Sequence, residues 1–205
     1  MFGDEEKTMF EMRKGFSVPF PEKIKEGYRC ENGIMIANVS ADKTNDVLEH
    51  FINDHEDEEL FFILELPTSE RFEPKDEKGN ITALHKDVYY IDGCTAALIR
   101  DILDTVGGLL LDDGMAQYGI GSHASSDEIM ICKYNEVVLF GKRTDGFFEQ
   151  HGIFRDDNLV SAWDTFTAQH SGICTRAEKD GRTVYDIPVI FAELGMYMAQ
   201  RREDG

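Results

Sequence analysis

The fold class is indicated most clearly by residues 128–140, which read Glu-Ile-Met-Ile-Cys-Lys-Tyr-Asn-Glu-Val-Val-Leu-Phe. Two apolar segments flank Tyr134-Asn135, and a turn residue such as asparagine between two such segments is typical of a tight β-turn. In residues 128–133 apolar and polar side chains alternate poorly, which is expected of a strand that is covered on both faces. The stretch therefore predicts a β-hairpin and antiparallel pairing.

Further strands are predicted on both sides of this hairpin. Apolar runs predict strands at residues 34–39, 60–66 and 87–91. Two Asp-Gly pairs predict two more hairpins, because Asp-Gly supplies the backbone conformation of a two-residue turn. Their arms are residues 109–111 and 115–121 around Asp113-Gly114, and residues 173–177 and 182–185 around Asp180-Gly181.

Apolar residues recur at helical spacing in four segments: 44–55, 95–107, 158–170 and 188–202. Gly107-Gly108 is expected to end the second helix, and Pro188 suits the first turn of the fourth. Strands and helices do not alternate regularly, as they would in a doubly wound sheet. The sequence thus predicts an α+β fold, a mainly antiparallel sheet of hairpins (a meander) packed by about four helices.

The expected domain organisation is simple. Residues 1–28 are predicted to form an N-terminal arm, with a short helix near residues 7–14, that packs back on the protein. Residues 29–205 are predicted to form a single α+β domain. The segment 67–85, with Pro74, Gly79 and many charges, is expected to be an exposed loop. If the chain has a domain boundary, it is expected there.

The charge balance is the least ordinary feature of the composition. The chain has 205 residues, with 40 acidic against 21 basic residues and a formal net charge of -19. Such a field repels nucleic-acid phosphates and anionic lipids, so we expect neither nucleic acid nor membrane as a partner. It attracts basic proteins and accelerates their association. High solubility alone would explain the same charge.

Cysteine usage and the N-terminal residues predict a reducing compartment. Residues 1–13 carry four acidic side chains, where a secretory signal would have a basic start and a long apolar run. The four cysteines form no Cys-x-x-Cys pair, which favours reduced thiols over disulfides or zinc. The six histidines lack the spacing of a metal site. We therefore expect a cytoplasmic protein with no metal and no cofactor; the oligomeric state stays open.

Cys94 is the candidate nucleophile of the sequence. It lies at the predicted start of the second helix, where unpaired amide groups lower the pKa of a thiol. His123 or His85 could act as its base. The alternative is that Cys94 is a small buried apolar residue, which is the commoner role of a free cysteine.

Residues 118–123, Tyr-Gly-Ile-Gly-Ser-His, form the most conspicuous local string. Gly119 and Gly121 could let a ligand approach the backbone, with Ser122 and His123 beside it. The string lacks the third glycine and the Lys-Ser/Thr of phosphate-binding loops. A bulged strand that runs into a loop is the alternative interpretation.

Three functional hypotheses remain open at this stage. The first is a non-catalytic acidic binding protein that engages a basic protein partner, for example an inhibitor or immunity-type protein. The second is a small enzyme that uses Cys94 with a histidine. The third is a small-molecule sensor with a pocket near residues 119–125. For the first hypothesis, the expected partner-binding residues are the acidic groups Asp54, Glu56, Asp57, Glu58, Asp112 and Asp113.

Overall fold

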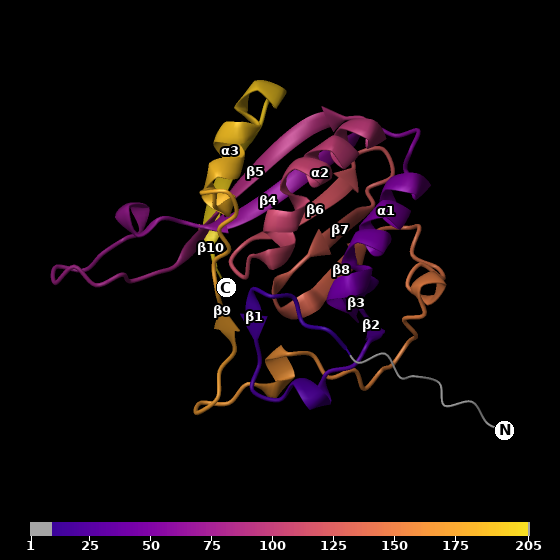
Figure 1. The fold of residues 1–205 in the computed structure, drawn as a ribbon, viewed down its shortest axis with the longest axis horizontal. Helices are drawn as coiled ribbons and strands as arrows, with labels where there is room; N and C mark the ends of the chain where they lie inside the picture. Colours follow the sequence, from indigo (N-terminus) through magenta and orange to yellow (C-terminus); the bar gives the residue numbers. More distant parts are fainter. Residues whose placement is uncertain (1–9, 205) are drawn as a thin grey trace.

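The computed structural model describes residues 10–204, and its main feature is one large antiparallel sheet (Figure 1). Eight strands pair in the order β10-β5-β4-β6-β7-β8-β3-β2. They are β2 (Gly27–Glu31), β3 (Ile34–Asn38), β4 (Leu60–Pro67), β5 (His85–Cys94), β6 (Gln117–Ser122), β7 (Glu128–Ile131), β8 (Glu136–Phe140) and β10 (Tyr197–Glu203). A separate pair joins β1 (Phe16–Ser17) to β9 (Ile173–Cys174).

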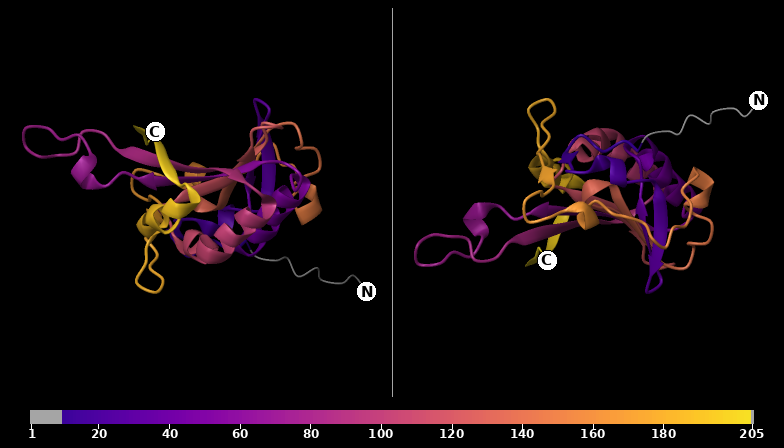
Figure 2. Two further views of the ribbon diagram at one scale, coloured as in Figure 1. Left: turned by 90° about the horizontal axis from the view of Figure 1, so that it is seen from above. Right: turned by 90° about the horizontal axis from the view of Figure 1, so that it is seen from below.

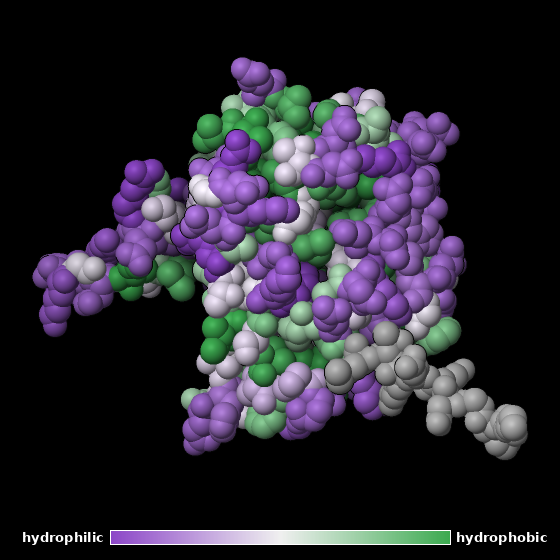
Figure 3. Space-filling view, in the orientation of Figure 1, coloured by the Kyte–Doolittle hydropathy of each residue, from purple (hydrophilic) through white to green (hydrophobic). Residues whose placement is uncertain are grey.

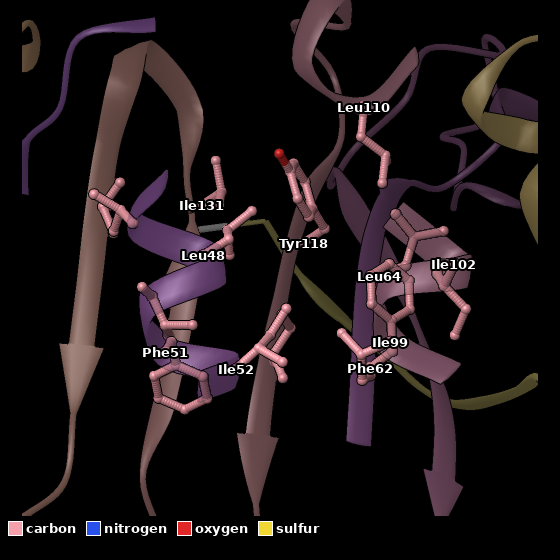
Figure 4. Close-up of a cluster of buried hydrophobic side chains, with 14 of the residues drawn as sticks. Leu48, Phe51, Ile52, Phe62, Leu64, Ile99, Ile102, Leu110, Tyr118 and Ile131 are labelled. Atoms are coloured by element: carbon pink, nitrogen blue, oxygen red, sulfur yellow. The ribbon is translucent and has the colours of Figure 1, made fainter. Parts of the chain in front are cut away.

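Three α-helices occur in the described chain: α1 (Thr44–Asp54), α2 (Ala96–Asp112) and the short α3 (Ile187–Ile190). All three lie on one side of the sheet (Figure 2). The apolar stripes of α1 and α2 face the sheet and meet side chains of its central strands (Figure 4). No described helix has the length and apolar content that a membrane span requires. The side chains labelled in Figure 4 are Leu48, Phe51, Ile52, Phe62, Leu64, Ile99, Ile102, Leu110, Tyr118 and Ile131.

The strand β4 lies inside the sheet and is buried on both faces from Leu60 to Leu66. Its even-numbered residues contribute to the core under the helices. Phe61 and Ile63 point to the opposite face, where they pack with Val88 and Met130 in a second apolar cluster. Burial on both faces explains why the run has no alternation of apolar and polar residues.

The second cluster lies on the face of the sheet opposite the α-helices, and its four central side chains are buried. None of the described α-helices covers it (Figure 2). Half-buried side chains surround the cluster, among them Tyr90, Val138 and Phe140. We call this surface the open face.

Several predicted elements are confirmed. The strands at 34–39, 60–66 and 87–91 correspond to β3, β4 and β5, and the first helix corresponds to α1. The hairpin of β7 and β8 turns at Tyr134 and Asn135, whose φ angles are 56° and 62°. The side chain of Thr95 caps α2 by accepting a hydrogen bond from the Leu98 N–H at 3.2 Å.

The predicted hairpin around Asp113-Gly114 is wrong, because α2 continues through Gly107-Gly108 to Asp112. Leu109 and Leu110 are buried in the core only if the helix continues, and this outweighs a cost of about 1 kcal/mol for each glycine. Asp113 ends the helix, and its carboxylate accepts hydrogen bonds from the N–H groups of Met115, Ala116 and Ala177.

The predicted helix over residues 158–170 is also wrong, since this segment contains only a 3₁₀ turn at Trp163–Thr165. The carboxylate of Asp164 accepts hydrogen bonds from both the N–H and the hydroxyl of Ser161, at 2.8 Å each. Such local side-chain hydrogen bonds compete with helix formation.

The predicted helix over residues 188–202 is wrong for most of its length. The helix α3 ends at Ile190, and the chain then enters β10. Gly195 has a left-handed backbone (φ 88°), through which an α-helix does not continue. Pairing with β10 satisfies the backbone groups of β5, and Arg201 holds Asp87 of β5 with two hydrogen bonds of 2.6 and 3.1 Å.

The described chain thus has three α-helices where the sequence predicted about four, and the sheet is no simple meander. The strands β6, β7 and β8 follow one another, but the next strand along is β3. Asp180-Gly181 does form a turn, closed by one bridge between Lys179 and Arg182, but β9 pairs with β1 instead of forming a hairpin.

The structure also contains a hairpin that the sequence analysis missed. The strands β2 and β3 turn at Asn32-Gly33, whose φ angles are 52° and 82°. Asn-Gly between two strands is a strong hairpin signal, and it was present in the sequence.

Two irregular segments complete the chain. In the predicted arm, residues 10–14 are not helical, and residues 7–9 lie outside the described residues. Phe16 and Ile24 pack with Tyr134 in a small separate cluster. The segment 68–84 links β4 to β5 and projects away from the body (Figures 1 and 2).

The packing of β6 gives a first prediction. Gly119→Ala should lower the free energy of unfolding by about 1–3 kcal/mol, because the added methyl group would overlap the carbonyl oxygen of Ile129 and the sulfur of Met130. Gly107→Ala is the matched control. Its methyl group would make an ordinary contact of 3.8 Å with the Cβ of Leu103, and the substitution should stabilise the helix by about 0.5–1 kcal/mol. Urea unfolding measures both. Equal effects would contradict this packing.

Candidate binding site on the open sheet face

A cavity of about 560 Å³ lies at one end of the open face. This size is within the range of small-ligand pockets. We call it the acidic pocket, because the described residues of its wall include three carboxylates and neither lysine nor arginine. Its lining residues are Phe61, Tyr90, Asp92, Ser122, His123, Ser126, Asp127, Glu128, Tyr197 and Ala199.

The aromatic wall follows from strand register. Ile63 of β4 lies opposite Tyr90 of β5, and Tyr90 lies opposite Tyr197 of β10. Because side chains alternate along a strand, Phe61 projects on the same face as Ile63. The rings of Phe61 and Tyr90 have centroids 5.6 Å apart, and those of Tyr90 and Tyr197 are 6.4 Å apart.

The two predicted ligand-binding glycines lie beneath protein side chains. A Cβ atom on Gly121 would overlap the ring of Phe61, and one on Gly119 would overlap the side chain of Met130. Both glycines pair regularly with β4 and β7, so the strand has no bulge there. They let Phe61 and Met130 lie flat on the sheet, while the predicted Ser122 and His123 do line the pocket.

A hydrogen-bonded group at the mouth of the pocket centres on Asp92. Its carboxylate accepts from the hydroxyl of Tyr197 at 2.7 Å and from Nε2 of His123 at 3.2 Å. The His123 ring also lies against Phe61, with centroids 4.7 Å apart. The hydrogen bond to Asp92 is the main reason why the pKa of Tyr197 is raised.

Glu128, the first residue of β7, is the one carboxylate of the described pocket wall that has no ion pair. It forms no ion pair with any residue between 10 and 204. Burial raises its pKa and the nearby carboxylate of Glu65 raises it further, while the guanidinium of Arg202 partly opposes this rise. A half-buried carboxylate that no cation pairs directly is a site where a bound cation would be stabilised.

The loop between β6 and β7 is held rigidly against α1. The buried His55 contacts Asp127 through Nε2 at 3.1 Å, and the Lys142 N–H donates to the same carboxylate at 2.6 Å. Burial alone would raise the pKa of Asp127, but these two hydrogen bonds lower it below its usual value. The hydroxyl of Ser122 donates to Glu58 at 2.5 Å, and this hydrogen bond is the main cause of a lowered pKa at Glu58.

The predicted partner-binding residues do not form one group. Glu58 borders the pocket through Ser122, and Asp54, Glu56 and Asp57 are exposed in the same segment. Glu56 lies 3.9 Å from Arg100 near the start of α2, whereas Asp112 is at the end of that helix, about 18 Å further on.

Asp113 has no exposed surface and is therefore not available for contact with a partner. Its carboxylate is used by the backbone N–H groups that it caps. The expectation that Asp112 and Asp113 act together at an interface has no support in their positions.

Cys94 is the last residue of β5 and has the properties of a core residue. Its side chain is 1% exposed, and burial raises its pKa to about 11, the opposite of what an activated thiol requires. Its Sγ donates to the carbonyl oxygen of Ile91 at 3.5 Å. The two histidines proposed as bases contact carboxylates instead: His123 contacts Asp92, and His85 contacts Glu73 at 2.6 Å.

Comparison with known proteins gives no family for the chain. No protein-family model, curated protein or solved structure matches it. The fold and the site together define an α+β protein with a helix-covered sheet and an acidic, aromatic pocket on the uncovered face. What this pocket can bind follows from its own side chains.

Sequence reasoning missed most of the residues that shape the pocket, including Glu128, which it placed only within a strand. Phe61 and Tyr90 lie within predicted strands, and their shared face could be read only once the pairing of these strands was known. Asp92 follows the apolar part of its strand, and Tyr197 was placed in a helix. The one available signal was Gly93, since a glycine in a strand can mark a place where a ligand or another backbone approaches closely.

Thiol reactivity tests the assignment of Cys94. Iodoacetamide should modify the exposed Cys30 first in the folded protein and Cys94 only on unfolding, because the reacting thiolate is disfavoured by burial. Time-resolved peptide mass spectrometry, with and without urea, measures this order. Modification of Cys94 in the folded state as fast as Cys30 would return Cys94 to the list of candidate nucleophiles.

Proposed function

We propose that the protein is a non-catalytic binding protein whose acidic pocket receives a cationic side chain of a basic protein partner. The observation that supports this most is the composition of the pocket wall. Asp92 and Glu128 stand beside the rings of Phe61, Tyr90 and Tyr197, and between residues 10 and 204 no basic residue other than His123 lines the pocket.

Carboxylates beside aromatic rings favour a guanidinium or ammonium group for two reasons. A charge-assisted hydrogen bond to a carboxylate is about twice as strong as a neutral one, and an aromatic face attracts a cation by about 0.5–2 kcal/mol. A cation next to Glu128 would also compensate a carboxylate that is partly removed from water. Arginine fits best, because its planar group both stacks on rings and binds carboxylates in pairs.

The wider charge supports recognition of a basic surface. The exposed Asp54 ends α1 and the exposed Glu56 and Asp57 follow it, and this segment reaches the pocket through the hydrogen bond between Glu58 and Ser122. Together with the net charge of -19, they would accelerate association with a basic protein. An inhibitor or immunity-type protein that blocks a basic enzyme is the particular form that we propose.

Four free thiols suit a reducing compartment, and we place the protein in the cytoplasm.

A small-molecule sensor is the second candidate, and one observation favours it. Ser122, His123 and Ser126 line the cavity, which lies where the sequence analysis expected a sensor pocket beside residues 119–125. The same wall chemistry implies that the ligand would be a small organic cation. A thermal shift with alkylguanidines but no binding to any basic protein would favour the sensor over the proposed function.

Charge removal in the pocket tests the proposed function. The double variant Asp92→Asn/Glu128→Gln should bind an oligoarginine peptide at least tenfold more weakly than the wild type, since a charge-assisted hydrogen bond contributes about 1.5–3 kcal/mol. Glu22→Gln/Asp42→Asn removes the same charge at exposed positions outside the pocket and is the matched control. Calorimetry at low and moderate salt measures the affinities. Equal weakening in both variants would show non-specific attraction and reject the pocket.

The raised pKa of Glu128 predicts a pH dependence. Protonated Glu128 persists above the ordinary pKa of a glutamate, about 4.3, and a neutral carboxyl attracts a cation weakly. Binding of the oligoarginine peptide should therefore strengthen as the pH rises through this region and level off once Glu128 is ionised. The Glu128→Gln variant should show a smaller rise over the same range. An identical profile in the variant would exclude Glu128 as the titrating group.

A further inference from the structure

A second cavity, of about 750 Å³, lies at the base of the projecting segment 68–84. It is formed by the end of β4, the start of the projecting segment, and the residues before α3. Its chemistry differs from that of the acidic pocket, because two arginines stand on its wall. The residues that the following argument uses are Thr68, Arg71, Phe72, Asp87, Arg176 and Tyr185.

Arg71 and Arg176 are unusual cations in so acidic a chain. The guanidinium of Arg71 lies 4.5 Å from the ring centroid of Phe72, and that of Arg176 lies 4.5 Å from the ring centroid of Tyr185. Neither forms an ion pair with any residue from 10 to 204, whereas the neighbouring Arg201 is paired with Asp87. Arg176 also interacts with the hydroxyl of Tyr185, and its other hydrogen-bond donors remain available for a ligand, as do those of Arg71.

The carboxylates near the cavity do not compete strongly for these two arginines. Asp87 accepts two hydrogen bonds from Arg201 and one from the hydroxyl of Thr68 at 2.8 Å. Glu70 also lines the cavity, but it is exposed and precedes Arg71 in the same 3₁₀ turn. With Asp87 paired to Arg201, the two arginines of the lining face one other carboxylate, that of Glu70.

The backbone around Arg71 is anchored to the sheet. The buried carboxylate of Glu73 accepts hydrogen bonds from the N–H of His85 at 2.7 Å and from its ring at 2.6 Å. The N–H of Thr68 donates to the carbonyl oxygen of His85 at 2.9 Å. These contacts close the base of the projecting segment and hold the backbone of Arg71 beside the cavity. A ligand therefore loses less binding free energy to ordering this backbone.

We propose that this cavity binds a small anionic molecule in which a carboxylate or phosphate is attached to an aromatic or apolar body. Arg71 and Arg176 bind the anionic group by charge-assisted hydrogen bonds. Phe72 and Tyr185, with the apolar side chains of Leu66 and Met115, contact the body of the ligand. This site is independent of the acidic pocket and of the function proposed for it.

Calorimetric titration of the full chain with phenyl phosphate and with benzoate tests the proposal, and inorganic phosphate tests whether the ring contributes. We expect saturable binding of at least one aromatic anion, with the preferred probe identifying phosphate or carboxylate, and weaker binding of inorganic phosphate. Arg71→Gln and Arg176→Gln should each weaken this binding by about tenfold.

Arg155→Gln is the matched control. Arg155 is exposed, pairs with Asp157, and lies beside β2 at the opposite edge of the sheet, so this variant should bind as the wild type does. Circular dichroism checks that all variants fold. The proposal is overturned if neither aromatic anion binds at millimolar concentration, or if Arg155→Gln weakens binding as much as the other two variants.

Discussion

The structure depends on the burial of β4 on both of its faces. The strand β4 pairs with β5 on one side and, from Leu60 to Glu65, with β6 on the other. Its alternate side chains enter the core beneath the helices and the cluster on the open face. Burial of an apolar side chain contributes about 1.5–3 kcal/mol to stability. The strand β4 contributes such side chains to both clusters and so joins them.

The same strand connects the two proposed sites. Leu60 lies opposite Ser122 at the end of the sheet that holds the acidic pocket. Leu66 and Pro67, at the other end of β4, line the cavity with the two arginines. With a rise of about 3.3 Å per residue the ends of β4 lie roughly 20 Å apart, which separates the pocket proposed to bind a cation from the cavity proposed to bind an anion. Figure 3 shows the helix-covered side of the protein. Hydrophilic residues cover much of this side, and apolar residues are exposed between them.

Signals from residues close together in the chain were sufficient to predict an element where the apolar pattern and the turn or cap residues favour the same structure. The helix α1, the hairpin of β7 and β8, and the Thr95 cap all follow from residues close together in the chain. Two of the errors have a long-range cause. Residues 107–111 and 188–202 contain glycine or apolar patterns that suit more than one structure, and distant partners decided between them: the core for Leu109 and Leu110, and the edge of β5 for β10.

The sequence by itself determined the α+β class, the main strands and the strongly acidic character, because these depend on composition and on short-range periodicity. Only the tertiary structure decided that Asp92, Glu128 and Tyr197 meet at one pocket, that Asp113 is buried, and that Cys94 is a core residue. The physical reason is register: the pairing of strands far apart in the chain sets which side chains share a face, and this pairing depends on long-range packing.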